Sequence, residues 1–124
     1  MEWQIIDVKN ESGKTIPFVS IGRGQLDFNA EACKLVNDTG EYRFAQLLKA
    51  SENGKLVIAV KFLTEYERNS IAIVRKNNKG KVVKGMTVRN KSAIQSLYGQ
   101  EGINNGVKRH GVELVDKNIL KILD

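Results

Sequence analysis

Two β-like runs joined by an Asn-Gly pair constrain the fold of this 124-residue chain more than any other feature. The runs cover residues 42–51 and 55–62, with Glu52-Asn53-Gly54 between them. Asn and Gly adopt the positive φ angles of a tight hairpin turn at little cost. Apolar residues alternate along the second run, and Val57 and Ala59 make its other face apolar too. We therefore expect a hairpin whose second strand is central in its sheet.

Weaker signals place the other elements. β-like runs predict further strands at residues 3–8, 15–21, 25–28, 70–75, 81–88 and 107–115. Turns are predicted at residues 10–13, 22–24 and 77–80. Asn29 caps a predicted helix at residues 30–36, and Asn90 or Thr87 caps one at about residues 91–98, because these side chains accept hydrogen bonds from the exposed N–H groups of a first helical turn. Gly99 then ends the second helix.

The order of these elements predicts a single domain, residues 1–124, of the α+β class. In it, antiparallel hairpins form a curved sheet or a small barrel with two or three short helices. Residues 100–106 predict a mobile loop, and Asp116 caps a predicted short helix at the end of the sequence. Residues 25–35 resemble 86–97, since each has a short strand, an Asn, an Ala three residues later and a Leu. Unless it arose by chance, this repeat predicts two strand–helix units packed as a pseudo-dimer.

Net positive charge is confined to one part of the chain. Residues 71–124 hold eleven Lys and Arg against four Asp and Glu, whereas residues 1–70 hold nine against ten. Seven basic residues and no acidic one lie between positions 75 and 91: Arg75, Lys76, Lys79, Lys81, Lys84, Arg89 and Lys91. Such a run favours a surface that binds a polyanion, above all nucleic acid. The alternative is a solvated hairpin whose lysines prevent edge-to-edge aggregation.

Aromatic residues are missing from this basic run, although single-strand binders usually combine a cationic groove with stacking aromatics. Among the aromatic residues elsewhere, Tyr66 is the one that we expect to be exposed, and Tyr66 or Tyr98 is the candidate for stacking on bases. Arg23, between Gly22 and Gly24, is a further candidate for phosphate contact; the simpler interpretation of these three residues is a turn.

Other chemistries have little support. Cys33 and His110 are the only Cys and His, so no metal site or nucleophile with an orienting partner can be assembled, and no cofactor is expected. We expect Cys33 to pack in the core and His110 to be a solvated strand residue. Glu65 and Glu67 resemble an acid–base pair, but nothing supplies a second component. The sequence therefore predicts a protein that is not an enzyme.

Residues 84–97 resemble the strand-to-helix segment of the positive-cofactor-4-like single-stranded-DNA-binding coactivators. Lys84-Gly85 leads into a hydrophobic–Thr–hydrophobic strand, and a helix follows. Four predicted strands between 42 and 88, followed by that helix, are similar to the ββββα unit of this family and of the related Whirly proteins. The resemblance implies a dimer whose curved sheet binds single strands through basic and aromatic residues.

Residues 22–35, followed by the strands around Asn53-Gly54, are similar to the AbrB-like swapped-hairpin DNA-binding domains. Those domains share the order Gly-Arg, strand, helix, hairpin. This second resemblance implies that Arg23 meets duplex DNA and that the internal repeat is a fused pseudo-dimer.

The first hypothesis is therefore a non-enzymatic protein that binds single-stranded DNA through its basic hairpin, as a homodimer. The alternatives are an AbrB-like regulator that binds duplex DNA, or a protein-interaction or inhibitor module that binds no nucleic acid. The predicted contact residues are Arg75, Lys76, Lys79, Lys81, Lys84, Arg89, Lys91, Tyr66 and Arg23. A cytoplasmic location fits the single Cys, and the sequence has no apolar run or leader that predicts a membrane partner or secretion. The small size suits a phage or mobile-element protein.

Overall fold

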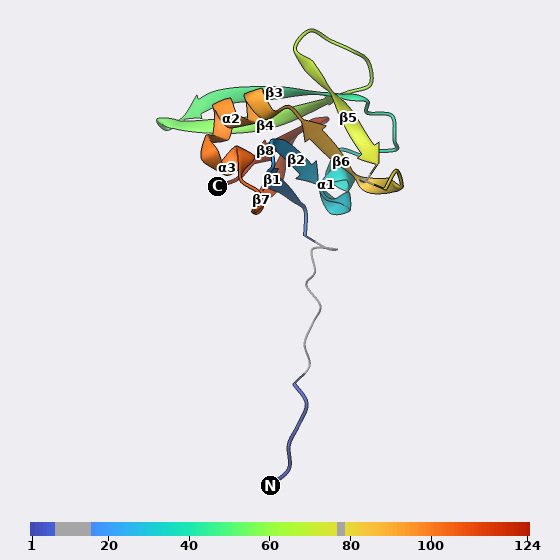
Figure 1. The fold of residues 1–124 in the computed structure, drawn as a ribbon, viewed down its shortest axis with the longest axis vertical. Coiled ribbons are helices and arrows are strands. Elements are labelled where there is room, and N and C mark those ends of the chain that lie inside the picture. The colour runs from blue at the N-terminus through green and yellow to red at the C-terminus, as the bar shows by residue number, and fades with distance from the viewer. Residues whose placement is uncertain (7–15, 77–78) are drawn as a thin grey trace.

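A computed structural model describes residues 1–6, 16–76 and 79–124, without the side chain of Lys76. Within them, eight strands form a closed antiparallel barrel in the order β1-β2-β6-β5-β3-β4-β8-β7. The strands are β1 (Phe18–Gly22), β2 (Gln25–Phe28), β3 (Phe44–Glu52), β4 (Lys55–Leu63), β5 (Ser70–Lys76), β6 (Val82–Arg89), β7 (Lys108–Asp116) and β8 (Ile119–Ile122). The helices are α1 (Ala30–Leu35), α2 (Lys91–Tyr98) and α3 (Gln100–Ile103). Figure 1 shows α1 on one side of the barrel and α2 with α3 on the other.

The hydrophobic core fills the barrel and extends under the helices. Alternate residues of the strands point inward, and Phe28 and Phe62 meet edge to face with ring centroids 5.2 Å apart. Cys33 of α1 and Ile94 of α2 are buried against this core. Fully burying one such large apolar side chain contributes about 2 kcal/mol, so the core is the main source of stability.

The predicted central hairpin is confirmed. β3 and β4 pair along their full length, from Phe44 opposite Leu63 to Glu52 opposite Lys55. The two turn residues have φ angles of 52° at Asn53 and 79° at Gly54, the left-handed region that favours this dipeptide.

The two helix caps are also confirmed. The Oδ1 atom of Asn29 accepts a hydrogen bond from the Ala32 N–H at 2.9 Å, and that of Asn90 accepts one from the Ala93 N–H at 3.0 Å. Gly99 ends α2 with a φ of 61°. These signals act within three or four residues, which is why the sequence could show them.

The predicted α+β class with a curved sheet is wrong, because the protein is mainly β and its sheet closes on itself. The difference begins at the end of the sequence, where a short helix was expected after Asp116. The chain forms strand β8 there instead, with Leu120 opposite Val60 of β4 and opposite Leu114 of β7. The apolar residues of β8 complete the barrel wall, so tertiary pairing overrides the local helix signal.

Three smaller expectations also differ or lie outside the description. Residues 100–106 are not simply a loop, because α3 occupies their first half. Residues 1–6 form no strand, and Trp3 and Ile5 there are exposed. The rest of the predicted strand 3–8, the turn at 10–13, the first residue of strand 15–21 and positions 77–78 of the turn 77–80 lie outside the described residues. In the described part of the chain, no helix is long and apolar enough to cross a membrane.

The barrel has an internal symmetry in its strand order. If β1, β2, β3 and β4 are exchanged with β5, β6, β7 and β8 in turn, every strand keeps the same neighbours in the closed barrel. The antiparallel pair of β2 and β6 lies at the centre of this symmetry. The residues before the two capping Asn residues nevertheless face opposite ways. Phe28 is buried in the core, whereas Arg89 at the corresponding position is exposed. The second half therefore presents a cation where the first half buries an aromatic ring.

Candidate nucleic-acid interface

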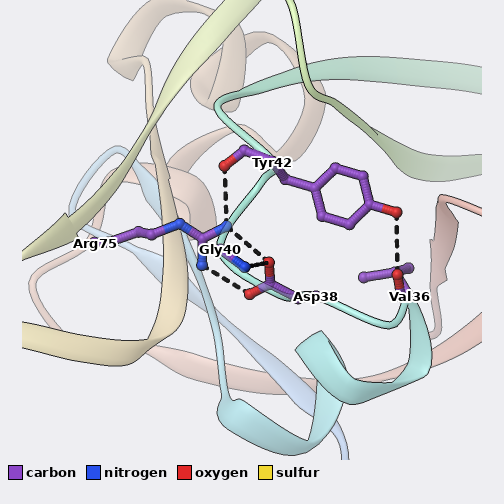
Figure 2. Close-up of polar contacts among 5 residues, drawn as sticks. All are labelled: Val36, Asp38, Gly40, Tyr42 and Arg75. Carbon is purple, nitrogen blue, oxygen red and sulfur yellow. Dashed lines mark hydrogen bonds and ion pairs between the residues drawn. The ribbon is translucent and has the colours of Figure 1, made fainter.

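Arg75, the first residue of the basic run, is held by the fold (Figure 2). Its Nη1 and Nη2 atoms donate to the two Asp38 carboxylate oxygens at 2.7 and 2.9 Å, and Nη2 also donates to the Tyr42 carbonyl at 2.9 Å. The Asp38 side chain is only 6% exposed. Burial by itself raises the pKa of Asp38, but hydrogen bonds from Arg75 and the Gly40 N–H, with the Arg75 charge, bring it below its usual value. We therefore leave Arg75 out of the candidate interface.

The remaining basic residues do not form one cluster, because they are distributed along strand β6. Lys79, Lys81 and Lys84 are exposed near its beginning, and Arg89 and Lys91 are exposed at and after its end. An eight-residue strand is roughly 25 Å long, so these two groups lie at opposite ends of the strand. The side chain of Lys76 lies outside what the structure describes.

Arg23 joins the group at the end of β6. It is the first residue of the β1–β2 turn, with a φ of 56°, and its backbone N–H donates to the Asn104 carbonyl at 2.8 Å. The next residue, Gly24, accepts a hydrogen bond from the Asn90 N–H at 3.2 Å, and a Cβ atom on Gly24 would lie 3.1 Å from Lys91. The turn therefore lies directly against the start of α2, and Arg23, Arg89 and Lys91 share one corner of the barrel.

The two arginines of this corner are oriented in the same way. The Nε atom of Arg23 donates to the Asn105 carbonyl at 3.1 Å, and that of Arg89 donates to Oε1 of Gln25 at 3.0 Å. Both acceptors are neutral, and among the described residues neither guanidinium pairs with a carboxylate. Because Nε is held, the terminal nitrogens have a defined direction and remain available to an anion.

The acidic residue Asp27 positions Gln25 in this corner. Both carboxylate oxygens of Asp27 accept from Nε2 of Gln25, at 3.1 and 2.8 Å, and Oδ1 also accepts from the Thr87 hydroxyl at 2.6 Å. These bonds leave Oε1 of Gln25 facing Arg89. The Asp27 carboxylate thus holds Gln25, and Gln25 orients Arg89. The charge of Asp27 also lowers the net positive charge of the corner by one.

Lys108 of β7 extends the basic corner, and the sequence did not single it out. β7 pairs with β1, and exposed Lys108 is opposite Ile21, two residues before Arg23. Only the β1–β7 register brings Lys108 here, and no local signal predicts that register. Arg109 is also exposed, but its Cζ atom lies 4.3 Å from the centroid of the Phe18 ring, at the other end of β1 from the turn. The basic corner is hereafter Arg23, Arg89, Lys91 and Lys108.

Of the two candidates for stacking on a base, only Tyr66 is well exposed, at 69%. It lies in the loop between β4 and β5, and its ring meets the Phe44 ring edge to face with centroids 5.6 Å apart. Tyr98 is half-buried, with its ring 6.3 Å from His110, and burial raises the pKa of its hydroxyl. Tyr66 is therefore the aromatic side chain that a base can reach.

His110 is not the solvated residue that the sequence suggested. Its side chain is 10% exposed, with Nε2 at 2.7 Å from the Glu101 carboxylate and Nδ1 at 2.9 Å from the Leu123 carbonyl. It connects β7 to α3 and to the end of the chain. Glu65 and Glu67 are exposed. Among the described residues, no cluster of His, Cys, Asp and Glu could bind a metal ion.

Cys33 is buried, and its environment makes the thiol unreactive. Burial, followed by the nearby charge of Asp38, raises the pKa of Cys33 to about 11. Since the thiolate is the reactive form, native protein at pH 8 is expected to react with Ellman's reagent at least 100-fold more slowly than protein unfolded in urea. Time courses at 412 nm measure both rates; equal rates would contradict this prediction.

Comparisons with protein-family models, with curated proteins and with solved structures found no match for this chain. The function of this protein therefore has to be argued from its own surface.

Proposed function

We propose that this chain is a non-enzymatic nucleic-acid-binding protein of the cytoplasm whose preferred ligand is single-stranded DNA. The observation that carries the proposal is the pair Arg23 and Arg89, each held at Nε by a neutral oxygen with its terminal nitrogens left for a ligand. A guanidinium fork of this kind matches the geometry of a phosphate group.

The surroundings of these arginines support the same function. Lys91 and Lys108 lie in the same corner and are exposed, so several phosphates can be neutralised together. Neutralising phosphates releases counterions from the nucleic acid, which gives binding that weakens as the salt concentration rises. The lysines at the other end of β6 add long-range attraction for the same polyanion.

A charge-reversal pair with a matched control tests the proposal. In a fluorescence anisotropy titration with a labelled oligothymidylate at 50 mM and 200 mM salt, we expect binding that weakens at the higher salt. The double variant Arg89→Glu/Lys91→Glu should bind at least tenfold more weakly at 50 mM salt, and its salt dependence should be shallower by about two phosphate contacts. Lys55→Glu/Lys117→Glu changes the net charge equally at two exposed hairpin residues and should stay within about threefold of the wild type.

The outcomes separate the proposal from its alternatives. No binding at 50 mM salt, or binding without salt dependence, would contradict it and would favour the protein-interaction module. Equal losses in the two double variants would show that only net charge matters and that the corner is no specific site. Competition with duplex of the same sequence distinguishes the single-stranded ligand from the duplex ligand of an AbrB-like regulator.

A further inference from the structure

A row of side chains crosses the outside of the barrel from Tyr66 to the basic corner. Phe44 of β3, on which the Tyr66 ring rests, is opposite Ala72 of β5. Ile73 is opposite Val88, so the preceding residue Ala72 lies beside Arg89, the residue that follows Val88. Residues opposite each other in a sheet share a face, so the Phe44 ring, the Ala72 methyl group and the Arg89 side chain are consecutive along one outer row.

The row continues beyond Arg89 to the β1–β2 turn. Gln25 is opposite Arg89 and holds its Nε atom, and Gln25 is also opposite Gly22, the residue before Arg23. The members of the row are Tyr66, Phe44, Ala72, Arg89, Gln25 and Arg23, and together we call them the cross-strand strip. Neighbouring strands are about 4.8 Å apart, so the strip is roughly 15–20 Å long from β3 to the turn.

The chemistry of the strip changes from one end to the other. At the β3 end, Tyr66 offers an exposed ring that meets the Phe44 ring edge to face, and exposed Ala72 beside Phe44 leaves room above the sheet. The loop of Tyr66 carries Glu65 and Glu67 against one Arg68, so it repels phosphate. At the other end, Arg89 and Arg23 attract phosphate. A ligand that lies along the strip therefore places a ring at Tyr66 and its negative groups toward Arg89 and Arg23.

We infer that the cross-strand strip is a track for about four to five unpaired nucleotides, laid across the strands, with one base stacked on Tyr66 and the phosphates of its neighbours on Arg89 and Arg23. This inference rests on the proposed nucleic-acid function and states the route and length of the ligand at that site. At a rise of about 3.4 Å per nucleotide along one stacked strand, the span of the strip holds about five nucleotides. This length falls at the short end of the range of about 4–16 nucleotides for single-strand sites on small barrels. A paired base has no free face for Tyr66, so the track selects unpaired strands.

Two variants of Tyr66 and a series of oligothymidylate lengths test the track. Unlabelled oligomers of 2 to 12 nucleotides compete with a labelled 12-mer in anisotropy measurements. For the wild type, the affinity should rise steeply up to about five nucleotides. Longer oligomers should gain only in proportion to the number of registers in which they can occupy the track. Tyr66→Ala should bind the 6-mer about tenfold more weakly at both salt concentrations, with the salt dependence unchanged, whereas Tyr66→Phe keeps the ring and should stay within twofold of the wild type. Circular dichroism confirms that both variants are folded.

The possible failures of the two proposals are distinguishable. If the 12-mer binds with the expected salt dependence but Tyr66→Ala stays within twofold of the wild type, the track is wrong and nucleic-acid binding stands. An affinity that rises steeply beyond eight nucleotides, or a 12-base-pair duplex that competes as well as the single strand, overturns the track in the same way. If no oligonucleotide binds at 50 mM salt, the proposed function and the track both fail.

Discussion

Replacing Gly85 by alanine is expected to lower the free energy of unfolding by about 3 kcal/mol. A Cβ atom at Gly85 would lie 2.3 Å from the backbone carbonyl oxygen of Phe28, and a backbone atom cannot rotate away as a side chain does. Gly85 precedes Met86, which is opposite Phe28 where β2 ends and the chain turns into α1. Relieving the clash must therefore separate β2 from β6 or displace α1, and overpacking of this kind costs about 1–3 kcal/mol or more.

Gly106→Ala is the matched control for this prediction. A Cβ atom at Gly106 would meet no atom within 4 Å, and its backbone is not in the left-handed region. It should leave the free energy of unfolding within about 0.5 kcal/mol of the wild type, or raise it slightly. Urea unfolding followed by far-ultraviolet circular dichroism measures all three proteins. A Gly85→Ala protein within 1 kcal/mol of the wild type would show that β2 and β6 separate easily.

Replacing Arg75 by methionine is expected to lower the free energy of unfolding by about 3 kcal/mol at pH 7. The substitution removes both hydrogen bonds to Asp38 and the one to the Tyr42 carbonyl, and leaves a carboxylate that is 6% exposed without its cation. Removing one partner of a buried ion pair costs about 3–5 kcal/mol, and the 22% exposure of Arg75 places this pair at the lower end.

The effect of Arg75→Met should depend on pH. Asp38 has its pKa below the usual value of 3.8 in the folded protein. Its contribution to stability is therefore complete above the pKa of the unfolded chain and is lost as the pH falls through the lower folded pKa. In Arg75→Met the buried Asp38 is stabilised by protonation instead. The difference between the two proteins should thus be full at pH 7 and shrink below about pH 4.

The double variant Asp38→Asn/Arg75→Met completes this experiment. It removes the charge that Arg75→Met leaves buried, so it should recover part of the lost stability relative to Arg75→Met alone. Urea unfolding at pH 7 and pH 3.5 provides the values, and a single variant within 0.5 kcal/mol of the wild type at pH 7 would contradict the prediction. Because Arg75 lies outside the basic corner, folded Arg75→Met should bind oligonucleotides within about threefold of the wild type.

The parts of the fold that the sequence predicted are those that depend on neighbours in the chain. The β3–β4 hairpin follows from two turn residues at Asn53-Gly54, and the limits of α2 follow from Asn90 and Gly99. The short strand β8 was mistaken for a helix because Ile119, Leu120 and Leu123 fit one face of a helix as well as they fit a strand. Its pairing with β4 and β7 decides between the two. β7 is the preceding strand, but β4 lies far away in the sequence and in the other half of the barrel.

The candidate site divides in the same way. Arg89, Lys91, Arg23 and Tyr66 could be nominated from residue type and local context, and whether they bind nucleic acid stays a prediction. The sequence had no means to show that Asp38 takes up Arg75, a contact across 37 positions. It also gave no reason to join Lys108 to the β1–β2 turn, since that depends on the register between β1 and β7.

By itself, the amino-acid sequence determined the turns, the helix caps and the total of positive charge, because each depends on residue type and a few neighbours. Only the tertiary structure decided that the sheet closes into a barrel, that the basic run is divided along β6, and that Arg23 and Arg89 meet in one corner. The physical reason is that strand pairing joins residues distant in the chain, and its register determines which side chains become neighbours. Arg89 is exposed where Phe28 is buried because β6 presents its outer face at the position where β2 presents its inner one.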